Sequence, residues 1–316
     1  MACFRPMEAW KSKHINPTGR RSLVFNSAHS DDPDAPMRIK CGVCIGCRMD
    51  KANEWALRCM HESEYHEENY FITLTYNEES LWSRDNPMSL DYRDIQKFHK
   101  RLRKRMSSFR FYIAGEYGPK NGRPHWHGLY FGLSIPDLQE AQLSPRSDVY
   151  YSSELLNDIW GQGFVTIGQL TPESAAYTAR YCFKKQRGET VNVHDHGLNV
   201  ATGESERLFW TNEETGEVLP LKPEFCAMSR RPGIGGQWIE DNLEDTYKDD
   251  FVVFKGRERA VPRYYDKYME KLDPWKFDEI KMDRVEKARQ LEEDRDRLRV
   301  METVKQLKAD KLVRYV

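Results

Sequence analysis

The stretch Arg123-Pro124-His125-Trp126-His127-Gly128-Leu129-Tyr130-Phe131 places two histidines inside an apolar, aromatic run. Such a run predicts a buried β-strand. Because successive side chains of a strand point to opposite faces, His125 and His127 share one face, and Trp126 and Gly128 take the other. Two imidazoles on one side of a rigid strand can chelate a metal ion. The alternative is a pair of core histidines that hydrogen-bond to the backbone.

A second strand-like segment, residues 109–117, precedes this stretch. The turn residues Gly118-Pro119-Lys120-Asn121-Gly122 lie between the two segments. If the segments pair as a hairpin, Glu116 lies beside the two histidines. Two imidazole nitrogens and one carboxylate oxygen leave coordination positions open. This set suits a catalytic divalent cation, Mg²⁺ or Mn²⁺, better than a closed structural site.

Outward from the hairpin, the chain alternates between strand and helix patterns. Residues 70–76 and 163–168 predict strands, residues 90–106 and 152–160 predict helices, and residues 133–151 predict a loop. Thr171-Pro172-Glu173 is a helix start, with a capping hydroxyl and a proline at the first helical position. This order predicts an α+β fold with a central, mostly antiparallel sheet of the split βαβ kind, flanked by helices.

The helix that begins at Thr171 carries Tyr177 and Tyr181, which are four residues apart and project from one face. Two such tyrosines in isolation indicate core packing. Next to a metal site they indicate chemistry, because a phenol can attack a phosphodiester that a divalent ion polarises. Lys184, with Arg180 and Lys185, would add positive charge near the phosphate.

The formal net charge is −1, so the chain as a whole has no basic excess. The helix predicted from Leu90 to Met106 has one apolar face, and its other face is basic. On a helix beside the histidine strand, a basic face predicts phosphate contacts, and a merely solvated face is the alternative. Arg230 and Arg231 predict a DNA-contacting loop, although a helix-capping turn before Gln237 explains the neighbouring glycines equally well. The candidate DNA-binding residues are Lys97, Lys100, Arg101, Arg103, Lys104, Arg180, Lys185, Arg230 and Arg231.

Cys41, Cys44 and Cys47 follow one another at a spacing of three, and Cys3 is available as a fourth thiol. The chain has no signal-peptide pattern and no apolar run of the ~18 residues that a membrane helix needs, so we expect no membrane partner and a cytoplasmic location. In a reducing compartment, clustered cysteines favour metal over disulfides. A structural Zn²⁺ is the leading interpretation, and an iron–sulfur cluster or free thiols are the alternatives.

Composition and motifs divide the chain into four expected segments. These are a Cys-rich segment and helix over residues 1–68, a catalytic core over 69–187, an extension over 188–272 and a charged helical tail over 273–316. A second His-x-His, at His194 and His196, has a charged middle residue and loop-like neighbours, so we do not assign it the metal. No Walker loop or dinucleotide fingerprint is present, so we expect no nucleotide cofactor.

This pattern resembles the HUH endonucleases that initiate rolling-circle replication, and it is similar to the replication initiation proteins of gokushovirus-like phages of the Microviridae. The resemblance covers about residues 1 to 270. The matching motifs are Cys41 to Arg48, Phe71 to Tyr76, Gly115 to Gly118, Arg123 to His127, Tyr177 to Tyr181, Ser229 to Gly235 and Val261 to Asp266.

The resemblance implies a site-specific endonuclease and strand transferase that acts through a 5′-phosphotyrosine intermediate. His125 and His127 would be metal ligands with Glu116 as the third, Tyr177 and Tyr181 the nucleophiles, and Lys184 the basic residue. The partners would be the single-stranded DNA origin of a phage genome and a helicase and polymerase of the bacterial host, whose cytoplasm is the expected location. A non-catalytic zinc-dependent DNA-binding protein and a metal-dependent hydrolytic nuclease are the alternatives.

Overall fold

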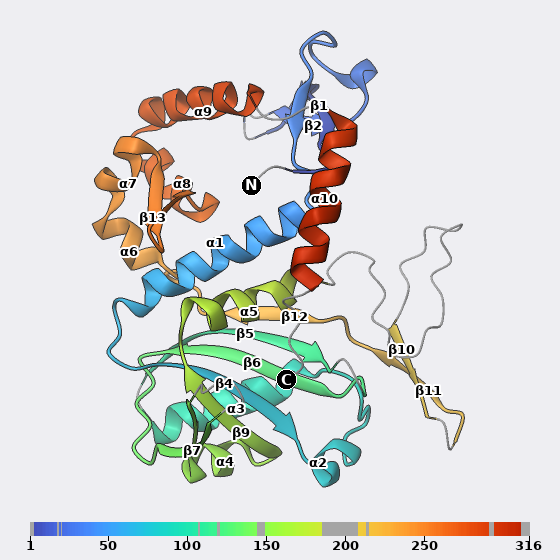
Figure 1. Ribbon diagram of the computed structural model, residues 1–316, viewed down its shortest axis with the longest axis vertical. Helices are drawn as coiled ribbons and strands as arrows, with labels where there is room; N and C mark the ends of the chain where they lie inside the picture. The colour runs from blue at the N-terminus through green and yellow to red at the C-terminus, as the bar shows by residue number, and fades with distance from the viewer. Residues whose placement is uncertain are drawn as a thin grey trace. The chain divides into compact units, whose positions relative to one another are not determined.

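A seven-stranded antiparallel sheet forms the centre of the fold (Figure 1). Its strands are β4 (Asn69–Tyr76), β5 (Arg110–Tyr117), β6 (Pro124–Phe131), β7 (Gln139–Leu143), β8 (Val149–Ser152), β9 (Gly163–Gln169) and β12 (Phe225–Met228). Their spatial order is β12-β5-β6-β4-β9-β8-β7, and every pair is antiparallel. The prediction of an α+β fold around an antiparallel sheet is therefore confirmed. The split βαβ topology of the HUH class stays a prediction.

The computed structural model describes residues 3–17, 19, 21–106, 108–118, 121–143, 149–184, 208–212, 215–290 and 294–310. The chain forms two compact units, one of residues 52–280 and one of residues 1–51 with 281–316. The helices are α1 (Ile45–Ser63), α2 (Glu78–Trp82), α3 (Tyr92–Arg105), α4 (Glu154–Trp160), α5 (Pro172–Lys184), α6 (Gly236–Asp241), α7 (Leu243–Asp249), α8 (Arg263–Leu272), α9 (Pro274–Arg289) and α10 (Arg295–Asp310). The segment boundaries expected at residues 68, 187 and 272 stay predictions.

One face of the large sheet packs against α3 and α4 (Figure 1). Ile95, Phe98 and Leu102 of α3 are fully buried there, as their helical spacing predicts. Trp126 of β6 lies in the same cluster and is fully buried. The indole N–H of Trp126 donates to the hydroxyl of Tyr76 at 3.0 Å. Trp126 thus occupies the face opposite to the histidines, as the period of a strand requires.

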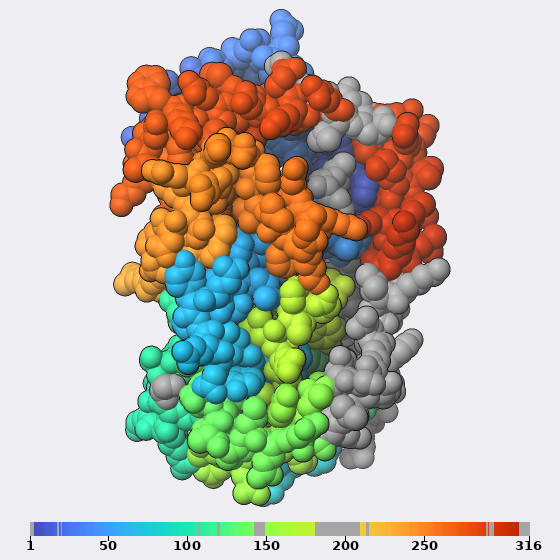
Figure 2. Space-filling view, turned by 60° about the vertical axis from the view of Figure 1, so that its left-hand side comes forward, coloured from blue at the N-terminus to red at the C-terminus, as the bar shows by residue number. Residues whose placement is uncertain are grey.

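The other face of the sheet packs against α1 and α5. Ala56 and Cys59 of α1 and Ala175 of α5 share a buried cluster with Leu129 and Phe131 of β6. The space-filling view shows the yellow-green residues of α5 beside the blue residues of α1 (Figure 2). Small side chains on both helices let the helix backbones approach the sheet closely. This is the face on which His125 and His127 lie.

A third cluster completes the larger unit, with Tyr247, Tyr265 and Met269 among its buried residues. It involves α6 to α9 and the hairpin of β13 (Phe251–Phe254) and β14 (Arg257–Ala260). A second hairpin pairs β10 (Leu208–Thr211) with β11 (Val218–Leu221).

The smaller unit has its own three-stranded antiparallel sheet, in the order β2-β1-β3. Its elements include β1 (Met7–Ile15), β2 (Arg21–Val24), β3 (Met37–Ile39), a short 3₁₀ helix (Ser27–His29) and α10. Residues 133–151, which we expected to be a loop, contain β7 and β8 instead. The pairing of β8 with β9 explains the difference, because backbone hydrogen bonds to a neighbouring strand do not require a strong local pattern.

Candidate active site

The β5–β6 hairpin brings Glu116 next to the histidines, as the sequence predicts. Glu116 is directly opposite His125 in the register, and Ala114 is opposite His127. Directly paired residues of an antiparallel sheet point to the same face, so the three candidate ligands lie together on one face. The backbone N–H of Gly118 donates to the carbonyl of Arg123 at 2.9 Å and closes the turn.

The three ligand atoms converge. Glu116 Oε2 lies 3.5 Å from Nε2 of His127 and 3.7 Å from Nε2 of His125. All three ligand atoms lie within 4.8 Å of one another. Donors at these separations can share one ion at the ~2.0–2.2 Å that nitrogen and carboxylate ligands prefer. The residues therefore fit a divalent metal ion.

Hydrogen bonds on the far side of each imidazole orient the two rings. Nδ1 of His125 donates to the carbonyl of Arg123 at 3.1 Å, and Nδ1 of His127 is 3.0 Å from Oγ1 of Thr73 on β4. This arrangement directs both Nε2 atoms toward Glu116, and such outer partners are what holds metal-ligating histidines in place. No local pattern pointed to Thr73, because only the pairing of β4 with β6 brings it opposite His127.

Electrostatics favour the metal-binding form of His127. Burial lowers the pKa of His127 well below its usual value, and the nearby His125 lowers it further. His127 is thus neutral at physiological pH, and a neutral imidazole is the form that coordinates a metal.

Helix α5 brings Tyr177 to the same place. Ala175, Thr178 and Ala179 are fully buried along this helix. The ring of Tyr177 lies 5.2 Å from that of His127 and 6.1 Å from that of Phe71, in both cases edge to face. The tyrosine predicted as a nucleophile therefore contacts a predicted metal ligand.

The start of α5 agrees with its predicted cap. Thr171 Oγ1 accepts from the N–H of Ser174 at 3.1 Å, and the Thr171 N–H donates to Ser174 Oγ at 2.8 Å. The backbone of α5 includes Tyr181 and Lys184, but their side chains lie outside the described part, as does all of Lys185. Arg180 is partly buried on α5. The second His-x-His, at residues 194–196, also lies outside the described residues.

The basic residues of α3 do not lie at this site, which corrects our expectation of a helix beside the histidine face. The apolar stripe of α3 packs against the face of the sheet that carries Trp126. The guanidinium of Arg101 donates to the carbonyls of Ile159 and Trp160, each at 2.7 Å, at the end of α4. Arg103 lies 4.6 Å over the ring of Phe109. Lys97, Lys100 and Lys104 are exposed on that side of the sheet.

Arg230 and Arg231 are exposed in the loop between β12 and α6. The N–H of Gly235 donates to Glu62 Oε2 at 2.7 Å, and Gly235 has a φ of 72° directly before α6. A non-glycine residue disfavours this backbone conformation. The glycines thus serve the turn into a helix, which was one of the two interpretations of this motif, and a DNA contact by the two arginines stays a prediction.

The smaller unit brings the four candidate cysteines together. Cys3 Sγ lies 3.6 Å from that of Cys41 and 3.9 Å from that of Cys44, and Cys41 Sγ lies 4.0 Å from that of Cys47. Burial raises the pKa of the Cys44 thiol, but N–H donors from Cys47 and Phe4 outweigh this effect and lower it overall. All four sulfurs lie within 4.8 Å of one another, which is too far for disulfides and suits one shared ion.

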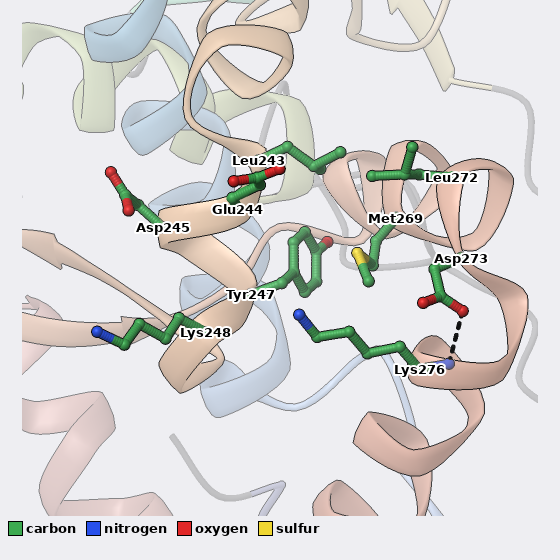
Figure 3. A pocket seen from close by; sticks show the side chains of 9 residues that line it. All are labelled: Leu243, Glu244, Asp245, Tyr247, Lys248, Met269, Leu272, Asp273 and Lys276. Atoms are coloured by element: carbon green, nitrogen blue, oxygen red, sulfur yellow. Dashed lines mark hydrogen bonds between the residues drawn. The ribbon is translucent and has the colours of Figure 1, made fainter.

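A pocket of about 540 Å³ lies elsewhere in the larger unit (Figure 3). Residues of α7 and α8 line it together with Asp273 and Lys276, and Asp273 accepts from the backbone N–H of Lys276 at 3.0 Å. None of the candidate site residues named above is among its lining residues. Among the described residues, no helix combines the length and apolar character that a membrane crossing needs.

Fold and site together define an α+β protein with a candidate metal-dependent active site on one face of an antiparallel sheet. The family model of the replication-associated protein ORF2 matches residues 69–186. Replication-associated protein VP4 of Bdellovibrio phage phiMH2K is 31% identical over 287 residues, covering 88% of this chain and 80% of that protein. Replication-associated protein ORF2 of Spiroplasma virus 4 is 32% identical over 314 residues, covering 92% of this chain and 86% of that protein.

Replication-associated protein ORF4 of Chlamydia phage 1 is 36% identical over 158 residues, covering 46% of this chain and 38% of that protein. No solved structure matches this chain. The chain belongs to the family of phage replication-associated proteins, and the resemblance to microvirus replication initiators is confirmed.

Proposed function

We propose that this protein is a site-specific single-stranded DNA endonuclease and strand transferase that initiates rolling-circle replication of a single-stranded DNA phage genome. Membership of the replication-associated family supports the role in replication. The observation that carries the chemistry is the convergence of Glu116, His125 and His127, with the ring of Tyr177 5.2 Å from that of His127. A metal site and a nucleophile thus share one face of the sheet.

Glu116, His125 and His127 would hold the divalent cation, Mg²⁺ or Mn²⁺, which when bound supplies positive charge that polarises the scissile phosphodiester. The phenol oxygen of Tyr177 attacks the phosphorus and loses its proton to solvent. The bond from phosphorus to the 3′-oxygen breaks, and this oxygen takes up a proton. The products are a 5′-phosphotyrosyl link and a free 3′-hydroxyl that primes synthesis.

Tyr181 would act as a second nucleophile. An α-helix places residues four apart on one face, so both phenols can serve one phosphate site in turn. One tyrosine then holds the old 5′ end while the other attacks the regenerated origin. Arg180, Lys184 and Lys185 add positive charge for the backbone of the strand.

The four cysteines would hold a structural Zn²⁺. Four thiolates around one ion at ~2.3 Å in a tetrahedron lie about 3.8 Å apart, and the measured sulfur separations run from 3.6 to 4.0 Å. An iron–sulfur cluster contains several metal atoms and would hold the four sulfurs farther apart. This ion would be distinct from the one at the histidines.

The partners that this function requires are the single-stranded origin of the phage genome and host enzymes. The sequence has no Walker motif, so a helicase and a polymerase of the bacterial host would unwind and extend the DNA. The proposed location is therefore the host cytoplasm.

The decisive experiment incubates the protein with end-labelled single-stranded origin DNA and Mn²⁺ and runs the products on a denaturing gel. Label should stay with the wild-type protein, and the Tyr177→Phe/Tyr181→Phe double variant should give none. Tyr65→Phe is the matched control, because Tyr65 is 42% exposed and loses the same hydroxyl. Cleavage without bound label would instead identify a hydrolytic nuclease, and binding without cleavage a DNA-binding protein.

A further inference from the structure

A cross-strand row connects the candidate metal site to a residue with no assigned role. Glu116 of β5 pairs with His125 of β6, His125 pairs with Thr75 of β4, and Thr75 pairs with Phe164 of β9. Directly paired residues point to the same face, so Phe164 lies on the face of the metal site. Strands are spaced ~4.8 Å apart, which puts the backbone of Phe164 about 10 Å from that of His125.

Phe164 is 65% exposed. Its neighbours on the same strand, Val165 and Ile167, are buried on the opposite face of the sheet. Among the residues of the seven-stranded sheet whose exposure the structure describes, Phe164 is the one large apolar side chain that is exposed. The next residue on its own face, Thr166, is exposed too. The sheet thus presents an open aromatic ring in line with the site.

The backbone around Phe164 is held firmly. A Cβ on Gly163 would come within 2.3 Å of the carbonyl oxygen of Thr75, so only glycine permits this approach of β9 to β4. The same carbonyl accepts from the indole N–H of Trp160 at 2.8 Å, and the hydroxyl of Thr75 donates to the carbonyl of Phe164 at 3.4 Å. The ring therefore stands on a fixed base.

We propose that Phe164 is a stacking platform for a nucleobase of the single-stranded DNA whose phosphate occupies the metal site, an inference that rests on the proposed function. Every base has a flat π-face, so an aromatic side chain binds single strands without reading their sequence. An unpaired base near the scissile phosphate has no partner to stack on except the protein. The row of Glu116, His125, Thr75 and Phe164 gives phosphate and base their separate places on one rigid surface.

The test measures the binding of a fluorescein-labelled oligothymidylate of about 16 nucleotides by anisotropy, without added Mg²⁺ or Mn²⁺. Loss of one stacked base corresponds to a weakening of about 5- to 150-fold, and we expect this for Phe164→Ala. Phe164→Trp should keep the wild-type affinity, whereas Phe164→Leu should not, because stacking needs a ring rather than apolar area. Trp275→Ala, which removes another exposed aromatic ring from outside the sheet, is the matched control and should bind as the wild type does.

An abasic deoxyribose-phosphate strand of the same length separates stacking from other effects. On this strand the wild type and Phe164→Ala should bind equally. Equal affinities on oligothymidylate, or an equal loss on both strands, would overturn the platform while leaving the nickase proposal intact. A wild type that binds neither strand would overturn both proposals, and an adduct formed by the double tyrosine variant would overturn the nickase mechanism alone.

Discussion

His127 is the residue on which the candidate site depends most. It is almost completely buried, with Thr73, Tyr177 and Glu116 arranged around its ring. Burial lowers its pKa, Thr73 orients its ring and Glu116 faces its Nε2. A buried histidine that served only packing would not need a neighbouring carboxylate at the same atom.

Replacing Thr73 by valine tests this arrangement. Thr73→Val keeps the shape of the side chain but removes the hydroxyl beside His127 Nδ1. Loss of such an outer partner weakens metal affinity by about 10–100-fold, which calorimetric titration with Mn²⁺ would measure. Thr166→Val is the matched control, because Thr166 pairs directly with Thr73 but is exposed and contacts neither histidine in the register. His127→Ala should abolish both Mn²⁺ binding and nicking, and an unchanged affinity in Thr73→Val would argue against the orienting role.

Among the elements, α5 positions the candidate nucleophiles because of its small buried residues. Ala175 and Ala179 are one turn apart and fully buried. Larger side chains there would lift the helix from the sheet and move Tyr177 away from His127. The sequence Ser174-Ala175-Ala176-Tyr177-Thr178-Ala179 thus has a geometric purpose as well as a high helix propensity.

Ala179→Leu should therefore reduce chemistry more than binding. Overpacking costs about 1–3 kcal/mol of the free energy of unfolding, and the shift of Tyr177 should lower the yield of covalent adduct at saturating DNA. Anisotropy should show little change in DNA affinity. Glu173→Ala, at an exposed position on the same helix, should change neither quantity. An adduct yield equal to the wild type in a folded Ala179→Leu protein would show that the spacing is not critical.

Helix α3 carries a buried histidine that makes stability depend on pH. Burial lowers the pKa of His99 to about 3, with a further contribution from Arg103, while the unfolded chain has a value of ~6.5. Below pH 6.5 the unfolded chain therefore binds a proton that the native protein does not. This one residue should cost about 1.4 kcal/mol of unfolding free energy per pH unit between these two values.

Urea unfolding of the wild type and of His99→Gln at pH 7.5 and pH 5.5 would measure this contribution. Both proteins should lose stability on acidification, because His61 is also buried with its pKa lowered to about 3. The loss should be smaller in His99→Gln, which no longer titrates at this position. Identical losses in the two proteins would contradict a neutral His99 in the native state.

At the scale of the whole molecule, the chain has two chemically different metal-binding sets. The larger unit offers two imidazoles and a carboxylate with open positions, and the smaller unit offers four thiols that can fill a tetrahedron. The first set suits catalysis, and the second suits structure. Leu298 of α10 packs fully buried beside the cysteines, so metal binding would also hold together distant parts of the smaller unit.

Purified protein should contain about one zinc per chain, bound by the four cysteines. Cys44→Ser should lose this zinc and more than about 2 kcal/mol of unfolding free energy, since metal binding is coupled to folding. Metal analysis and thermal unfolding would check both, with Cys226→Ser, a cysteine outside the cluster, as the matched control. Protein without zinc that takes up none on incubation would contradict the assignment, and so would iron in its place.

The sequence by itself determined the parts that depend on local chemistry. The period of two along residues 124–131 set the histidines and Trp126 on opposite faces, and the turn residues after Tyr117 predicted the hairpin that brings Glu116 alongside. The cap at Thr171 and the apolar stripe of α3 were equally local. Each of these features follows from a few neighbouring residues, so no knowledge of distant contacts was needed.

Only the tertiary structure decided which strands are neighbours and which face each helix covers. Strand β12 pairs with β5, which precedes it by more than a hundred residues, and β7 and β8 form where the local pattern indicated a loop. The same non-local pairing puts Thr73 at His127 and Phe164 in the row of His125, and it sends the basic face of α3 away from the site. Register and layer order follow from the burial of whole apolar faces, and that burial is a property of the assembled sheet rather than of any one segment.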